Sequence, residues 1–235
     1  MAERAEFWEA YSSEEWTYLL DPPQSGARNM ERDLELLAEA ERPTLRLYDW
    51  SRPTLSLGYH QRQDWVDLEL CQRQGVEVVR RPTGGRALLH LPGEITYSVV
   101  LPRLGAVGVR PAFQAIVNLL ARSLERLGLP VSTASQGHIP SSASHPSCMA
   151  VTAPGEIIAR GRKLVGSAQV RRYGNLLQHG SLVRAYQPEL LALLIPGAQP
   201  QMDLESLGFG QLQPAQIMES WRQVWEREVH KLRVD

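Results

Sequence analysis

Cys148 and Lys163 are the two residues of this chain whose types and spacing point most directly to covalent chemistry. The cysteine lies fifteen residues before the lysine, and an expected strand and hairpin between them can fold the thiol back toward the ammonium group. A cation beside a thiol lowers the thiol pKa and raises the fraction present as nucleophilic thiolate. We therefore predict a catalytic cysteine supported by a lysine, although base rates favour an unreactive loop cysteine when Cys148 is considered alone.

Metal binding is a second interpretation of the segment around Cys148. His138 and His145 precede the cysteine, and imidazole and thiolate groups are common zinc ligands. Their separation fits no standard zinc pattern and the sequence offers no evident fourth ligand, so we expect no metal site.

A Thr-Gly-Gly-Arg turn lies within the stretch RRPTGGRALLHLPGEITYSVVLP, residues 80–102. Gly84 and Gly85 allow backbone dihedrals that a side chain would forbid, and they let main-chain N–H groups point at an anion or a carbonyl oxygen. A Gly-Gly pair alone is typical of an ordinary turn, but the three arginines beside this one favour a binding site. The residues predicted to bind substrate here are Arg81, Thr83, Gly84, Gly85, Arg86 and His90.

Two later segments, GRKLVGSAQ and LQHGSL, supply the remaining candidates. The small residues at 166–168 keep the surface of an expected strand low, which is typical of a strand that another group lies against. A histidine beside a glycine at a strand end is more often structural than catalytic, and no Ser/His/Asp triad can be inferred. The glycine spacing matches neither a Walker loop nor a dinucleotide-binding fingerprint. The residues predicted to line the site here are Gly166, Ser167, Ala168, Gln169 and His179.

Hydrophobic periodicity predicts the helices that position these groups. The clearest begins at Pro111 and ends at Gly128, with an apolar stripe at helical spacing between them. An earlier helix begins at Asn29, which we predict as its N-cap. Cys71 has apolar neighbours at spacings of three in a short helix and is predicted to be a buried structural thiol. The predicted helices cover residues 29–42, 64–75, 111–128, 188–195 and 214–232.

Alternating apolar residues predict strands on both sides of the glycine turn. Three further antiparallel strands are expected between residues 149 and 183, with tight turns at 160–161 and 173–174. Residues 132–148 show neither periodicity, which indicates a long functional loop. The strands predicted before and after the turn cover residues 44–50, 54–59, 76–80, 86–91 and 94–101, the first two as a hairpin or as successive strands.

The composition is that of an ordinary globular protein, with 43% hydrophobic and 22% charged residues among 235. We expect one domain over residues 1–235, with an extended N-terminal arm at 1–26 and a C-terminal helical segment at 184–235. A formal net charge of −1 argues against a nucleic-acid binder that depends on phosphate neutralisation. Because we find no secretory signal, no apolar run long enough to span a bilayer and only two cysteines, we expect a cytoplasmic protein without membrane contact.

The chain resembles the lipoate-protein ligase and octanoyltransferase superfamily, to which biotin-protein ligases are distantly related. Four stretches carry the resemblance, in the order NMERDLELL, PTLRLYDWSRPTLSLGYHQ, RRPTGGRALLHLPGEITYSVV and GRKLVGSAQVRRYGNLLQHGSL, from about Asn29 to Val183. The resemblance implies an α/β fold of the α+β type, with a mixed, mostly antiparallel sheet flanked by helices. It also implies that a medium-chain acyl group lies in a tunnel roofed by the glycine turn, with Lys163 reaching its carbonyl end.

Within this superfamily, three features favour a transferase. The ATP-dependent ligases typically carry SGGG where this chain has TGGR, so Arg86 departs from the pattern that binds an acyl-adenylate. The ligases also commonly have an accessory C-terminal domain, and a short segment follows the matched region here. TGGRALLH, EITYSVV and a cysteine shortly before GRKLVGSAQ are similar to the octanoyl-[acyl-carrier-protein]:protein N-octanoyltransferases that use an acyl-cysteine. The alternatives are a lipoate ligase that uses ATP and Mg, a lipoyl-domain amidotransferase, and a non-catalytic acyl-binding protein.

The resemblance implies a reaction without a cofactor. Cys148 attacks an octanoyl thioester on acyl carrier protein, Lys163 favours the thiolate, and backbone N–H groups near residues 166–169 stabilise the oxyanion. A lysine of a lipoyl domain, in the glycine cleavage H protein or the E2 component of a 2-oxoacid dehydrogenase, then takes the acyl group.

Donor and acceptor are both acidic proteins in this superfamily, so local arginines are candidates for steering them although the chain is near neutral. For Arg171 and Arg172, simple pairing on the surface of the sheet is an equally weighted alternative. The four candidates are Arg80, Arg81, Arg171 and Arg172.

Overall fold

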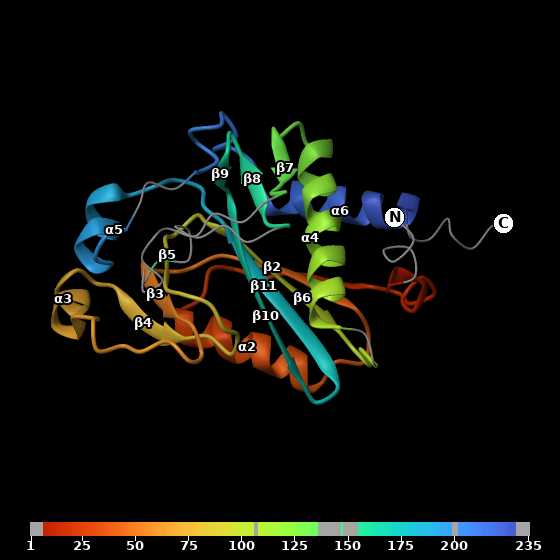
Figure 1. Cartoon of the computed structure of the whole chain (residues 1–235), viewed down its shortest axis with the longest axis horizontal. Helices are drawn as coiled ribbons and strands as arrows, with labels where there is room; N and C mark the ends of the chain where they lie inside the picture. The colour runs from red at the N-terminus through yellow and green to blue at the C-terminus, as the bar shows by residue number, and fades with distance from the viewer. Residues whose placement is uncertain (1–6, 106–107, 136–146, 148–154, 199–201, 229–235) are drawn as a thin grey trace.

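The computed structural model describes residues 7–105, 108–135, 147, 155–198 and 202–228. Its largest sheet has five strands in the order β1-β2-β6-β11-β10 (Figure 1). β1 runs parallel to β2, and the other neighbouring strands are antiparallel. The five strands are β1 (Thr17–Leu20), β2 (Thr44–Tyr48), β6 (Ile95–Leu101), β10 (Val165–Arg172) and β11 (Asn175–Leu182).

One face of this sheet packs on α4 (Val109–Arg126) and α6 (Pro214–Glu228), which also contact each other. Successive strand residues point to opposite sides of a sheet, and on β6 it is Val99 and Leu101 that join the apolar cluster containing both helices. Trp221 of α6 is fully buried in the same cluster. This face therefore carries the main hydrophobic core.

The other face packs on α2 (Gly26–Ala38), whose Leu37 lies in a small apolar cluster with Val100 of β6. The side chain of Ser25 caps the helix, and the first two N–H groups of the helix donate to the carboxylate of Glu77. A side-chain cap and a negative charge both stabilise a helix N-terminus. The sheet face beneath α2 carries the polar residues of the candidate site.

A second sheet, in the order β4-β3-β5, holds the glycine turn. β3 (Thr54–Leu57) lies parallel to β4 (Glu77–Arg80) and antiparallel to β5 (Leu88–His90), and the turn connects β4 to β5. Figure 1 shows this sheet beside α3 (Leu68–Arg73) and α5 (Pro188–Leu194), with which it shares an apolar cluster.

A third sheet, in the order β7-β8-β9, lies beyond one end of the largest sheet (Figure 1). Its strands are β7 (Val131–Thr133), β8 (Ile157–Ala159) and β9 (Arg162–Lys163), and both pairs are antiparallel. The tight turn predicted at Arg160-Gly161 joins β8 to β9, with both residues at positive φ, as that turn requires. The mixed α/β fold and its mostly antiparallel pairing are as predicted.

The first predicted helix begins earlier than expected, and Asn29 is not its N-cap. Ser25 is the cap, and Asn29 lies inside α2 with a buried side chain whose amide donates to the carbonyl of Asp49 at 3.0 Å. An asparagine is a frequent cap because its side chain bonds to the backbone, and here the same property bonds the helix to another segment.

Residues 7–26 do not form the predicted extended arm. Trp8 and Trp16 are buried against Trp225 of α6, with ring centroids 5.0 and 4.7 Å from it, and Thr17–Leu20 is a strand of the largest sheet. The aromatic residues that marked this stretch in the sequence pack into the core, and their burial stabilises the N-terminal segment on the sheet.

Two further predictions concern residues 44–75. The runs 44–50 and 54–59 are successive strands in different sheets and do not form a hairpin. Cys71 is buried in α3, and burial raises the pKa of its thiol, as expected for a structural cysteine. Most of the predicted loop at 132–148 and the strand predicted at 149–153 lie outside the described residues. Across the part of the chain that the structure describes, no helix has the length and apolar character needed to cross a bilayer.

Candidate active site

A hollow lies between α2, the polar face of the largest sheet and the second sheet. Its apolar lining comes from Met30, Tyr48, Trp50 and Leu88. The mixture of apolar walls with a few polar groups is typical of small-ligand sites. Six of the residues predicted from the sequence line it, namely Arg81, His90, Gly166, Ser167, Ala168 and His179.

The glycine turn is held against a third glycine that sequence reasoning missed. Gly85 has a φ of +92°, which favours glycine, and its carbonyl oxygen lies so close to Gly58 that a Cβ on Gly58 would be 1.9 Å away. The N–H of Tyr59 donates to the carbonyl of Thr83 at 2.8 Å. The available signal was Gly58 in the TLSLGY run. It follows the end of β3, and the glycine turn packs on it.

Arg81 fastens the turn from inside. Its guanidinium donates to the carbonyl of Ser56 at 2.7 Å, to that of Gly84 at 3.1 Å and to that of Arg86 at 2.9 Å. The side chain is buried and lines the hollow, so the prediction that Arg81 steers an approaching protein is wrong. The guanidinium is therefore buried, and its hydrogen bonds to backbone carbonyls stabilise the conformation of the turn.

The N–H groups of Gly84 and Gly85 point away from the groups that bind the carbonyls of the turn. The carbonyls of Thr83 and Gly84 are taken by Tyr59 and Arg81, and the C=O and N–H of a trans peptide point in opposite directions. Within the described residues, the N–H groups of Gly84 and Gly85 donate to no acceptor. The turn therefore offers two oriented donors.

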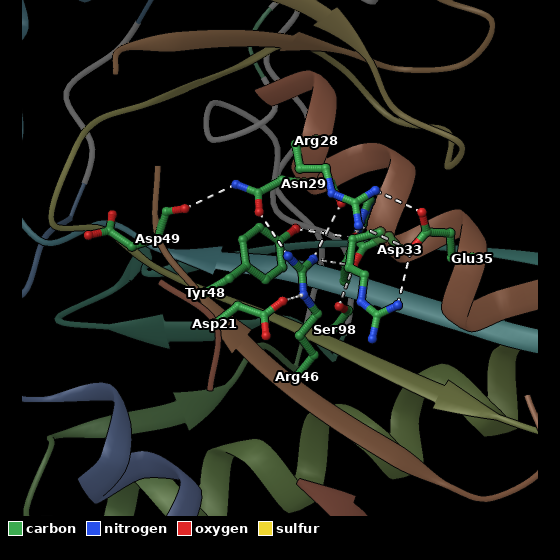
Figure 2. Close-up of polar contacts among 11 residues, drawn as sticks. Asp21, Arg28, Asn29, Asp33, Glu35, Arg46, Tyr48, Asp49 and Ser98 are labelled. Atoms are coloured by element: carbon green, nitrogen blue, oxygen red, sulfur yellow. Dashed lines mark hydrogen bonds and ion pairs between the residues drawn. The ribbon is translucent and has the colours of Figure 1, made fainter. Parts of the chain in front are cut away.

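His179 connects the turn to a buried polar network under α2. Its Nε2 lies 2.7 Å from Thr83 Oγ1 and its Nδ1 lies 2.9 Å from Asp33 Oδ2. Asp33 also accepts from Arg46 at 2.8 Å and from Ser98 at 2.7 Å, and Figure 2 shows these side chains turned toward one another. Burial alone would raise the pKa of Asp33, but His179, Arg46 and Ser98 together outweigh burial and lower it.

Sequence reasoning missed Asp33 and Arg46. Arg46 alternates with apolar residues in TLRLY, which is typical of a strand with one face in solvent, yet it is only 1% exposed and its guanidinium lies 3.9 Å from the ring centre of Tyr48. The available signal was the pairing of a single arginine on an apolar strand with a single aspartate beside Met30 and Leu37 on one helix face.

His90 belongs to a second buried group. Its Nδ1 lies 2.6 Å from Glu94 Oε1, its Nε2 lies 2.7 Å from Ser56 Oγ, and its ring stacks on Trp50 at 3.9 Å. Ser181 also donates to Glu94. Burial raises the pKa of Glu94 well above its usual value, and burial with the nearby Arg81 charge lowers the pKa of His90 well below its own. Both shifts favour the uncharged form of the side chain.

Lys163 is buried and pairs with Glu156, whose carboxylate lies 2.8 Å from Nζ. Glu156 was not predicted. Cys148 lies outside the described residues, as do His138 and His145 of the metal alternative. The residue before the cysteine, Ser147, forms an isolated parallel bridge with Ala87, directly after the glycine turn.

Gln169 and the three other arginines predicted to steer partner proteins do not line the hollow. Gln169 donates to the carbonyl of Val109 at 2.6 Å. Arg80 is exposed, and its guanidinium donates to the carbonyls of Gly58 and Gln61. At the tip of the β10–β11 hairpin, Arg171 donates to the carbonyl of Gly105, and Arg172 lies over the ring of Tyr59 at 5.1 Å.

Residues 25–204 match the family model described as the lipoyl protein ligase A/B catalytic domain. The chain is 44% identical over 183 residues to octanoyltransferase LipM of Carboxydothermus hydrogenoformans, which covers 72% of this chain and 65% of the relative. It is 43% identical over 181 residues to octanoyltransferase LipM of Moorella thermoacetica, over 73% of this chain and 66% of the relative. The chain thus spans just under two thirds of the length of these relatives.

Solved structures show the same fold. Lipoate-protein ligase A bound with ATP aligns with a TM-score of 0.76 and 21% identity, over 92% of this chain and 86% of the other. A putative lipoate protein ligase from T. acidophilum aligns with a TM-score of 0.74, at the same identity and coverage.

Proposed function

The chain belongs to the family of lipoyl protein ligase A/B catalytic domains, and we propose that it is an octanoyltransferase that works through an acyl-cysteine at Cys148. The donor is octanoyl-acyl carrier protein and the acceptor is the lysine of a lipoyl domain. The observation that carries the proposal is the hollow beside the glycine turn, with an apolar lining and a wall of small residues at Gly166–Ala168. The names of the relatives at 43% and 44% identity support the same reaction class.

The reaction takes place in two steps. The Cys148 thiolate attacks the carbonyl carbon of the octanoyl thioester, the bond from that carbon to the donor sulfur breaks, and the donor thiol leaves with a proton. The acceptor amine then attacks the acyl-cysteine, an amide forms, the amine loses a proton and the Cys148 thiol is restored. Because the donor thioester is already activated, the reaction needs neither ATP nor Mg.

Lys163 supports the first step as a fixed positive charge. Its ion pair with Glu156 favours the ammonium form, and an ammonium group beside a thiol stabilises the thiolate. The acceptor lysine belongs to the lipoyl domain, so Lys163 stays unmodified through the cycle. Glu156 is the part of this arrangement that sequence reasoning did not supply.

Main-chain N–H groups stabilise the oxyanion in both steps. We predicted those near residues 166–169, which lie on β10, the edge strand that pairs with β11 on one side of the sheet. The N–H groups of Gly84 and Gly85 are further candidates, because the carbonyls of the same two peptide groups, those of Thr83 and Gly84, are anchored on the opposite side and the two N–H groups donate to no other described group. Arg86 follows them, where the ligases of the superfamily typically carry a third small residue.

Mass spectrometry of the intact protein tests this proposal. Incubation with octanoyl-acyl carrier protein, without ATP, adds one octanoyl group, and the Cys148→Ala protein stays unmodified. Cys71→Ser is the matched control, since that buried thiol lies in α3 and its removal leaves the modification intact. Addition of a lipoyl domain then discharges the acyl group onto the acceptor.

Other outcomes identify the alternatives. Modification that persists in Cys148→Ala excludes the acyl-cysteine. Acceptor labelling that requires free octanoate or lipoate with Mg-ATP indicates a ligase. Acylation from an octanoylated lipoyl domain, and not from acyl carrier protein, indicates an amidotransferase.

A further inference from the structure

Thr83 and His179 lie 96 residues apart in sequence and meet in a buried contact at the glycine turn. Thr83 Oγ1 is 2.7 Å from His179 Nε2, and neither residue is more than 4% exposed. Thr83 begins the turn and His179 lines the hollow, so this contact joins two parts of the candidate site. Neither residue has an assigned role in the acyl transfer described above.

Asp33 determines which atom is donor and which is acceptor in the hydrogen bonds from Asp33 through His179 to Thr83. Its Oδ1 accepts from the guanidinium of Arg46 and from the hydroxyl of Ser98, and its Oδ2 accepts from Tyr48 and from His179 Nδ1. An ionised carboxylate only accepts, so His179 must carry its hydrogen on Nδ1. In the neutral ring Nε2 is then an acceptor, and the Thr83 hydroxyl must donate to it.

This order of donors fixes the turn. With its hydroxyl bound to His179 and its carbonyl bound to Tyr59, Thr83 is held from two sides. The peptide groups that follow it carry the N–H groups of Gly84 and Gly85, whose directions depend on the orientation of Thr83.

We propose that Asp33, His179 and Thr83 form a positioning line that holds the glycine turn in the orientation needed for acyl transfer. The role in transfer rests on the proposed function, whereas the effect on binding of an acyl group does not. Thr83 is not a nucleophile in this arrangement, because its side chain is completely buried.

Substitutions at Thr83 test the positioning line with the smallest change in side-chain shape. Valine has nearly the same shape but lacks the hydroxyl, whereas serine keeps it. We expect Thr83→Val to lower the rate constant of acyl-enzyme formation about tenfold or more, because small misplacements of groups around a reacting atom are costly. The KM for the carrier protein stays within about twofold, since the carrier docks outside the hollow, and Thr83→Ser restores most of the rate.

Asp33→Asn tests the direction of the bonds. Arg46 and Ser98 both donate to Oδ1, so the amide oxygen takes that position and the amide nitrogen faces His179. His179 then accepts at Nδ1 and carries its hydrogen on Nε2. We expect ¹⁵N NMR of the histidine rings to show the Nδ1–H tautomer at His179 in the unsubstituted protein and the inverted tautomer in Asp33→Asn.

Ser98→Ala is the matched control for stability. It removes one donor to Asp33 but leaves Oδ2 and His179 in place, so it lowers the melting temperature without changing the rate constant of acyl-enzyme formation. If Thr83→Val follows Ser98→Ala in stability and rate alike, the positioning role is excluded. Retention of the Nδ1–H tautomer in a folded Asp33→Asn protein excludes it as well.

Calorimetric binding of octanoate separates this inference from the proposed function. Octanoate binding that weakens about tenfold in Thr83→Val and recovers in Thr83→Ser supports the line even where no acyl-enzyme forms, and that combination overturns the proposed function alone. An acyl-enzyme that forms at the same rate in Thr83→Val and in the unsubstituted protein overturns the inference alone.

Discussion

At the scale of single residues, the close approach of Gly58 to Gly85 gives the first prediction. A methyl group on Gly58 would meet the Gly85 carbonyl at 1.9 Å, so Gly58→Ala must displace the turn or the end of β3. We expect a loss of about 1–3 kcal/mol in the free energy of unfolding by urea denaturation, the usual cost of an inserted methyl group.

Gly84→Ala is the control for this substitution. A Cβ on Gly84 meets no atom within 4 Å, and its φ lies outside the left-handed region. Its free energy of unfolding should stay within about 0.5 kcal/mol of the parent value. Equal losses in the two variants would contradict the packing seen at Gly58.

The opposite pKa shifts of His90 and Glu94 predict opposite pH effects on stability. The folded pKa of Glu94 is raised from 4.5, so its contribution to stability is present below that value and is lost as the pH rises toward the folded pKa. The folded pKa of His90 is lowered from 6.5, so its contribution is present above 6.5 and is lost as the pH falls. Between pH 4.5 and 6.5 the two effects on the free energy of unfolding oppose each other. Above pH 6.5 only the loss of stability from Glu94 remains.

We therefore expect Glu94→Gln to gain stability relative to the parent as the pH rises from 6.5 to 8. The relative gain approaches about 1.4 kcal/mol per pH unit while the parent Glu94 stays protonated. Urea denaturation at several pH values measures it. A difference between the two proteins that does not change with pH would show that Glu94 is already ionised when folded.

Residues with a local signal could be predicted from the sequence, and those with a distant partner could not. Two adjacent glycines beside arginines, and small residues before a glutamine, identified five of the thirteen residues that line the hollow. Asp33 was missed because its partners lie on other strands, up to 146 residues along the chain, and Glu156 was missed because its partner Lys163 lies across a turn. Arg81 was correctly placed at the site, but the additional steering role was wrong because its residue type does not reveal that backbone carbonyls surround it.

At the scale of elements, the contact between α2 and the largest sheet depends on a buried charge. Arg46 of β2 binds Asp33 and the side chain of Asn29, both from α2. Arg46→Met keeps the length of the side chain but leaves Asp33 without its cation. We expect a loss of about 3–5 kcal/mol in the free energy of unfolding, because removal of one partner leaves a buried charge uncompensated.

Arg32→Met is the control at this scale. Arg32 pairs with Glu35 on the outer side of α2, where both side chains are partly exposed, so its replacement should leave the urea midpoint unchanged. A midpoint shift as large as that of Arg46→Met would mean that the buried pair does not hold α2.

The elements themselves followed their periodicity, and the errors arose where tertiary contacts decide. α4, α6 and the β8–β11 hairpins lie within a few residues of the predicted bounds, since an apolar stripe or a tight turn specifies each. Asn29 was read as a cap from its type, but Glu77 and Ser25 already hold the helix start. The N-terminal segment has no periodicity of its own, so its packing on α6 was not visible.

At the scale of the whole molecule, the near-neutral charge leaves protein recognition to a small surface. Arg172 lies over the exposed ring of Tyr59. The segments that carry these two residues both contact the glycine turn, through Gly58 and Ala168. We expect Arg172→Glu to lower the rate with octanoyl-acyl carrier protein about three- to tenfold at low salt, with a smaller effect at high salt.

A small donor isolates this effect from the chemistry. The rate of Arg172→Glu with octanoyl-pantetheine should match that of the parent, and Arg122→Glu on α4 should react normally with the carrier protein. Equal losses with both donors would place the defect in the hollow and not in docking.

The stacking of Trp50 on His90 supplies the molecule with an internal optical reporter. Trp50 lines the hollow, whereas Trp8, Trp16, Trp221 and Trp225 cluster on the far side of the largest sheet. An acyl chain that enters the hollow changes the polarity around one indole and leaves these four unchanged. The difference in emission between the parent protein and Trp50→Phe therefore reports occupancy, so ligand entry can be followed in real time without a label.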